Sequence, residues 1–165
     1  MRLSHGVPML ALIGLLLGSG VAPVATATAG SAPGGAGVAI AGASSSVLMD
    51  GGLGGVLRQG PWTLLVPPGA FRGKTQVTMY LRQGRTPTVS IEMADPSLNS
   101  FMRPVILHFR AASPSAAAGQ AIYLWNESEL RWDPVSGSVA NTVTGGVLAP
   151  LQHFSTYTVG GKAGW

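Results

Sequence analysis

The chain contains no cysteine, which excludes disulfides, thiolate nucleophiles and cysteine-ligated metal sites. Charged residues are also scarce, at 10% of 165 residues, whereas about a quarter is usual for a globular protein. The histidines are His5, His108 and His153, and none has a partner at the spacing of a zinc site. We therefore predict no bound metal and no cofactor in a chain long enough for one domain.

Signals of catalysis and of nucleic-acid binding are also missing. The net charge of +4 comes from basic residues scattered along the chain, whereas a nucleic-acid-binding protein is expected to cluster them with aromatic residues. The sequence has no G-x-S-x-G motif and no carboxylate pair in a supporting context. Neither a nucleic-acid partner nor an enzyme acting on an external substrate is expected.

Residues 1–29 have the pattern of a secretory signal peptide. Arg2 precedes an apolar run over residues 7–17, which is shorter than the ~20 residues that span a bilayer as a helix. Small residues then offer Ala-x-Ala cleavage after Ala27 or Ala29. A retained N-terminal anchor is the alternative. We expect a secreted or periplasmic chain that has no membrane span once this peptide is removed.

The next stretch, residues 30–53, is rich in Gly, Ala and Ser. It contains too little apolar surface to offset the entropy of ordering it, so we predict a flexible leader. Residues 38–40 offer a short edge strand as an alternative. The pattern changes to regular apolar alternation over residues 54–160, the predicted folded domain, and residues 161–165 form a tail.

The alternation has a period of two, which is typical of half-buried strands. The predicted inward-facing sets are Val77, Met79 and Leu81, then Val89, Ile91 and Met93, then Val105, Leu107 and Phe109. Residues 121–125 and 130–132 indicate a hairpin, and residues 153–159 a last strand with Phe154 on one face. No stretch has helical apolar spacing, and the Ala-rich residues 113–119 predict a loop or one turn. The predicted fold is all-β, a small antiparallel β-sandwich.

Several of these stretches together are similar to the ZU5-type β-sandwich domain. The residues that carry the similarity are the apolar strand and Pro-x-Gly-Ala element at 64–71, the strand at 104–107, the hairpin at 123–125 and 130–135, and the closing His-Phe-Ser segment at 151–157. Their order covers most of residues 54–160, so the chain resembles an exported stand-alone copy of this domain. The resemblance implies a sandwich and an interaction module, and it names no substrate.

The His153-Phe154-Ser155 triplet is the candidate site for chemistry. In some ZU5-type proteins such a triplet cuts its own Phe–Ser bond, and the resemblance implies that Ser155 would attack the Phe154 carbonyl while His153 accepts its proton. In a strand, His153 and Ser155 would point to the same face. The alternative is structural, with Phe154 in the core, His153 at the rim and Ser155 bonded to backbone.

Three further interpretations concern surfaces. Our leading hypothesis is an exported, non-enzymatic structural or interaction module whose partner, a protein or a cell surface, the sequence does not identify. A carbohydrate-binding sandwich is another, and it requires Trp125 and Trp132 to lie exposed and coplanar on one face. Glu127, Glu129 and Asp133 could supply oxygen ligands to Ca²⁺, but their spacing favours a solvated hairpin tip.

Overall fold

The computed structural model describes residues 42–161. The predicted signal peptide at residues 1–29, most of the predicted leader and most of the tail lie outside these residues. The described part of the chain thus begins within the predicted leader and ends at the first residue of the predicted tail.

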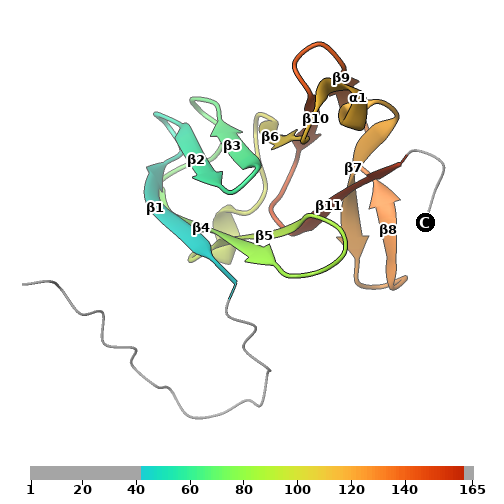
Figure 1. The fold of residues 1–165 in the computed structure, drawn as a ribbon. Helices are drawn as coiled ribbons and strands as arrows, with labels where there is room; N and C mark the ends of the chain where they lie inside the picture. Colours follow the sequence, from blue (N-terminus) through green and yellow to red (C-terminus); the bar gives the residue numbers. More distant parts are fainter. Residues whose placement is uncertain (1–41, 162–165) are drawn as a thin grey trace, which may run out of the picture. The chain divides into compact units, whose positions relative to one another are not determined.

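This part of the chain is all-β and consists of two antiparallel sheets packed face to face (Figure 1). Sheet A has six strands in the order β1-β4-β5-β11-β7-β8, which are β1 (Ser44–Asp50), β4 (Lys74–Arg82), β5 (Thr88–Met93), β11 (Thr156–Gly161), β7 (Gln120–Asn126) and β8 (Arg131–Pro134). Sheet B has five strands in the order β2-β3-β6-β10-β9, which are β2 (Gly55–Gln59), β3 (Trp62–Val66), β6 (Val105–Arg110), β10 (Gly146–Leu151) and β9 (Val139–Asn141). The predicted small antiparallel sandwich is confirmed.

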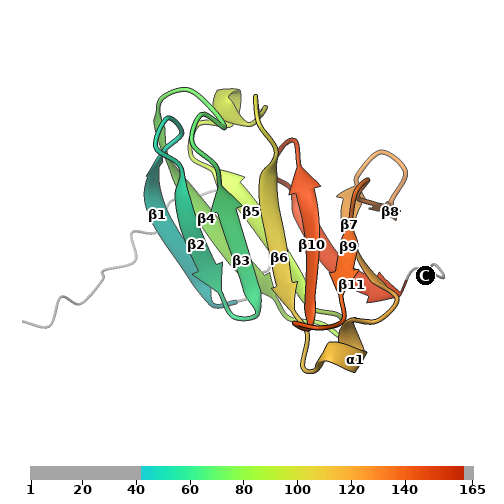
Figure 2. The same ribbon diagram turned by 90° about the horizontal axis from the view of Figure 1, so that it is seen from above.

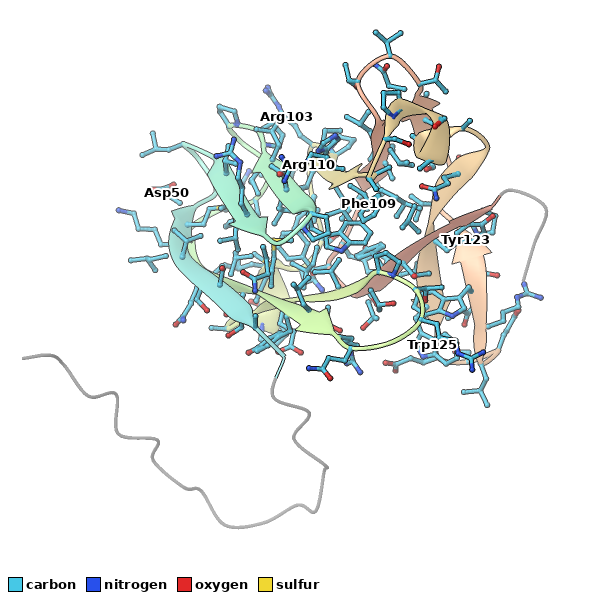
Figure 3. All side chains as sticks on the ribbon, in the orientation of Figure 1. Asp50, Arg103, Phe109, Arg110, Tyr123 and Trp125 are labelled. Carbon is cyan, nitrogen blue, oxygen red and sulfur yellow. The ribbon has the colours of Figure 1, made fainter. Side chains whose placement is uncertain are left out.

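The core lies between the sheets and is built from the predicted alternation. The buried side chains of the predicted sets are Val77, Met79, Val89, Ile91, Met93, Val105, Leu107 and Phe109. Leu81, which is the last member of the first set, is partly buried and packs against the core. Figure 3 places Phe109 between the two layers. Each such side chain stabilises the fold by roughly 1.5–3 kcal/mol when fully buried.

Strand β1 begins the domain earlier than the sequence predicts, because residues 44–50 belong to the predicted leader. The strand pairs with β4 along its whole length. Of its side chains only that of Met49 is buried, and the hydroxyls of Ser46 and Thr78 bond across the pair at 2.8 Å. Backbone pairing with β4, together with core contacts of Met49 and the partly buried Val47, therefore holds this strand. Composition alone does not reveal such pairing.

The chain changes sheets between β10 and β11, and this corrects the predicted last strand. The strand expected over residues 153–159 begins three residues later, and the first three residues lie in the connection. Phe154 is buried within that connection, whereas Tyr157 and Val159 provide the inward-facing side chains of β11. Moving to the other sheet reverses which alternate residues face inward, so a period of two cannot be continued across this point.

The helical segments of the described residues are short. One is the 3-10 turn η1 (Pro96–Leu98) and the other is α1 (Pro114–Ala117). Ser113 caps α1, since its hydroxyl accepts a hydrogen bond from the Ala116 amide at 3.1 Å. This agrees with the loop or single turn expected there. Neither segment is a candidate for crossing a membrane, and no longer apolar helix exists between residues 42 and 161.

Candidate functional site

The connection between β10 and β11 carries the predicted self-cleavage triplet. His153 is exposed, Phe154 is buried and Ser155 is half-buried. Because none of the three belongs to a strand, the prediction that His153 and Ser155 share a strand face is wrong. Within the described residues, the structure records no hydrogen bond between these two side chains. The triplet is therefore held in place through hydrogen bonds to its backbone groups.

The Asn99 side chain clamps the backbone of Phe154 from both sides. Its Nδ2 donates to the Phe154 carbonyl at 2.9 Å, and the Phe154 amide donates to its Oδ1 at 2.5 Å. The Phe154 ring packs edge-on against Phe101, with ring centroids 4.7 Å apart. Asn99 directly follows η1, whose first turn is capped by the Asp95 carboxylate accepting from the Ser97 amide at 3.0 Å. The turn that Asp95 caps thus positions the Asn99 side chain.

The carbonyls on either side of Phe154 are also bonded. The Tyr157 hydroxyl donates to the His153 carbonyl at 2.6 Å, and the Ile91 amide donates to the Ser155 carbonyl at 2.9 Å. Burial raises the pKa of Tyr157, which keeps this hydroxyl a donor. Three successive carbonyls therefore each accept a hydrogen bond, and the Phe154–Ser155 peptide is held on both sides.

Two adjoining hollows on the outer face of sheet A form what we call the outer groove. Their volumes are about 450 and 350 Å³. Arg82, Glu127 and Thr156 line both hollows, which makes them one continuous depression. The larger hollow extends to Asn99 and Ser155, so the candidate nucleophile also lies at this groove.

The floor of the outer groove is a chain of hydroxyl groups. The Nε of Arg82 donates to the Ser90 hydroxyl at 2.6 Å. That hydroxyl bonds in turn to the Thr156 hydroxyl at 2.8 Å. On the neighbouring position of the same two strands, Thr88 donates to Thr158 at 3.2 Å. The bond to Ser90 thereby fixes the Arg82 side chain over the floor. It uses only Nε, so the other guanidinium N–H groups take no part in this chain of hydrogen bonds.

Trp125 and Trp132 line the smaller hollow. They are directly opposite on β7 and β8, with ring centroids 5.2 Å apart and ring planes at 61°. Both are half-buried, and Figure 3 shows Trp125 beside β8. The carbohydrate-binding interpretation requires the two rings to lie exposed and coplanar on one face; they do share a face, but they are half-buried and tilted against each other. Edge-to-face contact lets one ring support the other, so they form a ridge rather than a flat platform.

Two acidic residues of the β7–β8 hairpin, Glu129 and Asp133, are paired with Arg131. Arg131 contacts the Asp133 carboxylate at 2.7 Å and the Glu129 carboxylate at 2.5 Å. Asn126 also donates to Asp133 at 2.8 Å, and the hydrogen bonds from Asn126 and Arg131 hold the pKa of Asp133 below its ordinary value. No cluster of three metal-ligating side chains exists among residues 42–161. The hairpin tip is a local ion-pair network.

His108 lies away from the triplet, on the outer face of sheet B. Burial, and secondarily the charge of Arg110, lower its pKa. Its imidazole packs over Gly146, where an added Cβ would come within 2.5 Å of Nε2. This contact explains a glycine at that position and assigns His108 a packing role.

Sequence reasoning missed Asn99 and Arg82. Arg82 could have been predicted from the sequence, because the two-residue period of β4 places every second residue on the outer face. Asn99 gave one weak signal, its position at the end of an Asp-Pro turn. Its partner is 55 residues away, and no local pattern predicts such a contact. Comparison with protein-family models and with curated proteins finds no match for this chain, so the ZU5-type resemblance stays a prediction.

Proposed function

We propose that this chain is an exported, non-enzymatic interaction module that binds its ligand in the outer groove. The observation that carries the proposal is the lining of the groove, which combines a tryptophan pair, fixed hydroxyls and a few charged groups. Concave sites with an aromatic wall and converging polar groups are typical of ligand-binding sites.

The chemistry of the lining favours a neutral polyhydroxyl ligand, a saccharide chain. Its charged members are Arg82, Glu92 and Glu127, so neither sign dominates and a strongly charged ligand gains little. Guanidinium, carboxylate and hydroxyl groups pair with sugar hydroxyls as donors and acceptors. The ridge of Trp125 and Trp132 offers apolar ring surface to the carbon–hydrogen face of a sugar.

A peptide added as an extra strand is a poorer fit. The groove crosses β5 and β11, whose backbone groups are already paired with neighbouring strands, and it reaches the edge strand β8 only at Trp132. Strand addition needs an unpaired sheet edge, whereas this site offers side chains. The ligand is therefore expected to be read by side-chain contacts.

The experiment is a titration of tryptophan fluorescence with neutral oligosaccharides of glucose, xylose, mannose and N-acetylglucosamine. Binding should perturb Trp125 and Trp132, and Trp132→Ala should weaken it by about tenfold or more. Tyr80→Ala is the matched control, because Tyr80 is an exposed aromatic on β4 that does not line the groove. Equal affinity of wild type and Trp132→Ala, or no response to any sugar, contradicts the proposal.

A second candidate, self-cleavage between Phe154 and Ser155, is favoured by the Asn99 clamp. Attack of the Ser155 hydroxyl on the Phe154 carbonyl carbon forms an ester and frees the Ser155 amine, and water then releases the Phe154 carboxylate. Negative charge develops on the Phe154 carbonyl oxygen, which already accepts a hydrogen bond from Asn99 Nδ2. A donor placed there stabilises the oxyanion, and His153 is the candidate base.

Mass spectrometry of the denatured, exported chain tests this candidate. Cleavage yields a fragment that begins at Ser155, which Ser155→Ala should abolish and Thr156→Ala should preserve. An intact wild-type chain rejects self-cleavage. The same spectrum tests export, since a chain that begins at Thr28 or Gly30 has lost the predicted signal peptide.

A further inference from the structure

Sheet B presents an apolar ladder on its outer face. Val56, Leu65, Ile106 and Pro150 are successive cross-strand neighbours on β2, β3, β6 and β10. Val56 and Leu65 are 46% and 48% exposed. This row of aliphatic side chains across four paired strands is an apolar surface that is most exposed at Val56 and Leu65, whereas Ile106 and Pro150 are half-buried.

Two further exposed apolar side chains lie on loops next to this sheet. Leu53, in the β1–β2 turn, is 78% exposed, and Met102, just before β6, is 57% exposed. The Gly51 amide donates to Gly73, and the Met102 amide donates to Ala70. These bonds tie both loops to the β3–β4 loop. Figure 2 shows η1 and these connections gathered at the end opposite to α1.

The charged side chains on the strands of sheet B have one sign. These strands contain Arg58 and Arg110, together with His108, and no acidic residue. The acidic residues of the chain, all of which lie on the strands of sheet A or on the connections after β5 and β7, are Asp50, Glu92, Asp95, Glu127, Glu129 and Asp133. The outer face of sheet B is therefore both apolar and cationic.

We infer that the outer face of sheet B is a docking surface for an anionic lipid bilayer. Aliphatic side chains enter the interfacial region while arginines meet lipid phosphates, and each basic residue near such a surface contributes about 1 kcal/mol. A second copy of the chain that docked through the same face would place arginines against arginines, and like charges repel. A protein interface usually mixes both signs of charge and is enriched in aromatic residues. The outer face of sheet B offers neither a mixture of charges nor aromatic side chains.

The inference is independent of the outer groove, which lies on the other sheet. A domain seated on a bilayer through sheet B would direct sheet A, and the groove, away from the lipid. Failure of sugar binding would leave the lipid inference intact, and the reverse also holds.

Vesicle flotation with the exported chain tests the docking surface. We expect binding to vesicles of phosphatidylcholine mixed with phosphatidylglycerol, weaker binding at high salt, and none to phosphatidylcholine alone. Leu65→Asp should reduce binding by about tenfold or more. Its matched control is Leu130→Asp, at an exposed leucine of the β7–β8 hairpin, which should bind as wild type does.

The charge arm uses pairs of substitutions. Arg58→Gln combined with Arg110→Gln should weaken binding by about thirtyfold, and Lys74→Gln combined with Arg85→Gln, on the sheet A half, should not. Circular dichroism checks that each variant is folded. Absence of binding to mixed vesicles overturns the inference, and an acidic protein then becomes the alternative partner for this face. Equal loss in the test and control variants overturns it as well.

Discussion

Asn99 shows how much one polar side chain can organise in a small domain without disulfides. Its amide makes both a donor and an acceptor contact with Phe154, on a connection between the two sheets. The buried Phe154 ring is thereby held against Phe101. The same two hydrogen bonds serve the fold and, in the self-cleavage proposal, the scissile carbonyl.

Asn99→Ala should lower the free energy of unfolding by about 2 kcal/mol, because it leaves the Phe154 amide and carbonyl without partners. Asn141 offers a matched control, since its carboxamide accepts from two amides in an exposed turn. Asn141→Ala should cost about 1 kcal/mol or less. Urea denaturation measures both values, and equal losses would contradict a special role for Asn99.

Trp62 is fully buried between the sheets, next to Phe109. Its Nε1 has no hydrogen-bond partner among the described residues. Trp62→Ala should therefore destabilise the domain by about 3–5 kcal/mol through the cavity it opens. Trp62→Phe removes the unpaired donor while it retains most of the ring, so its loss should be less than half as large. Denaturation curves for the two variants that coincide would refute this distinction.

At the scale of elements, the first turn depends on a glycine. Gly51 follows β1, its amide donates to Gly73, and its carbonyl accepts from Gly69. A Cβ on this residue would overlap the Phe71 carbonyl oxygen. Backbone therefore occupies the space that any side chain would need.

Gly51→Ala should lower the unfolding free energy by about 2 kcal/mol or more, because the turn must move away from Phe71. Gly161→Ala is the matched control, since an added Cβ there meets nothing within 4 Å. We expect the control to stay within about 0.5 kcal/mol of wild type. Thermal unfolding compares the two, and a Gly51→Ala variant as stable as the control would contradict the steric argument.

At the scale of the whole domain, the acidic residues are confined to one side. The strands of sheet B carry basic and apolar groups and no acidic residue, whereas sheet A and its connections carry charges of both signs together with the outer groove. Two surfaces of different chemistry on opposite sheets suit a module that is anchored on one side and binds on the other.

Stability at alkaline pH should depend on Tyr157, whose pKa burial raises. In the unfolded chain this phenol ionises near pH 10, while in the fold it stays protonated. Its contribution is therefore present below about pH 10, and above it the unfolding free energy should fall by about 1.4 kcal/mol per pH unit. Tyr157→Phe should lose about 1 kcal/mol at neutral pH with the bond to His153, yet show a flatter alkaline decline. Parallel declines would exclude this origin.

The all-β class, the inward sets of β4, β5 and β6, and the β7–β8 hairpin could be predicted from the sequence, because the two-residue period is a local property of a strand. The loop or single turn over residues 113–119 follows from local composition in the same way. At the candidate site, the shared face of Trp125 and Trp132 was predictable from their hairpin. Their mutual tilt was not, since it depends on packing.

Sequence alone determined the all-β class and the inward-facing side chains of strands such as β4, β5 and β6, because their burial pattern repeats along the chain. Tertiary structure alone decided that Ser44–Asp50 joins sheet A, that the His153-Phe154-Ser155 triplet crosses between sheets, and that Asn99 reaches it. It also decided which cross-strand neighbours line up into a groove on one sheet and an apolar ladder on the other. These features depend on pairing between distant segments, and local periodicity carries no information about which segments pair.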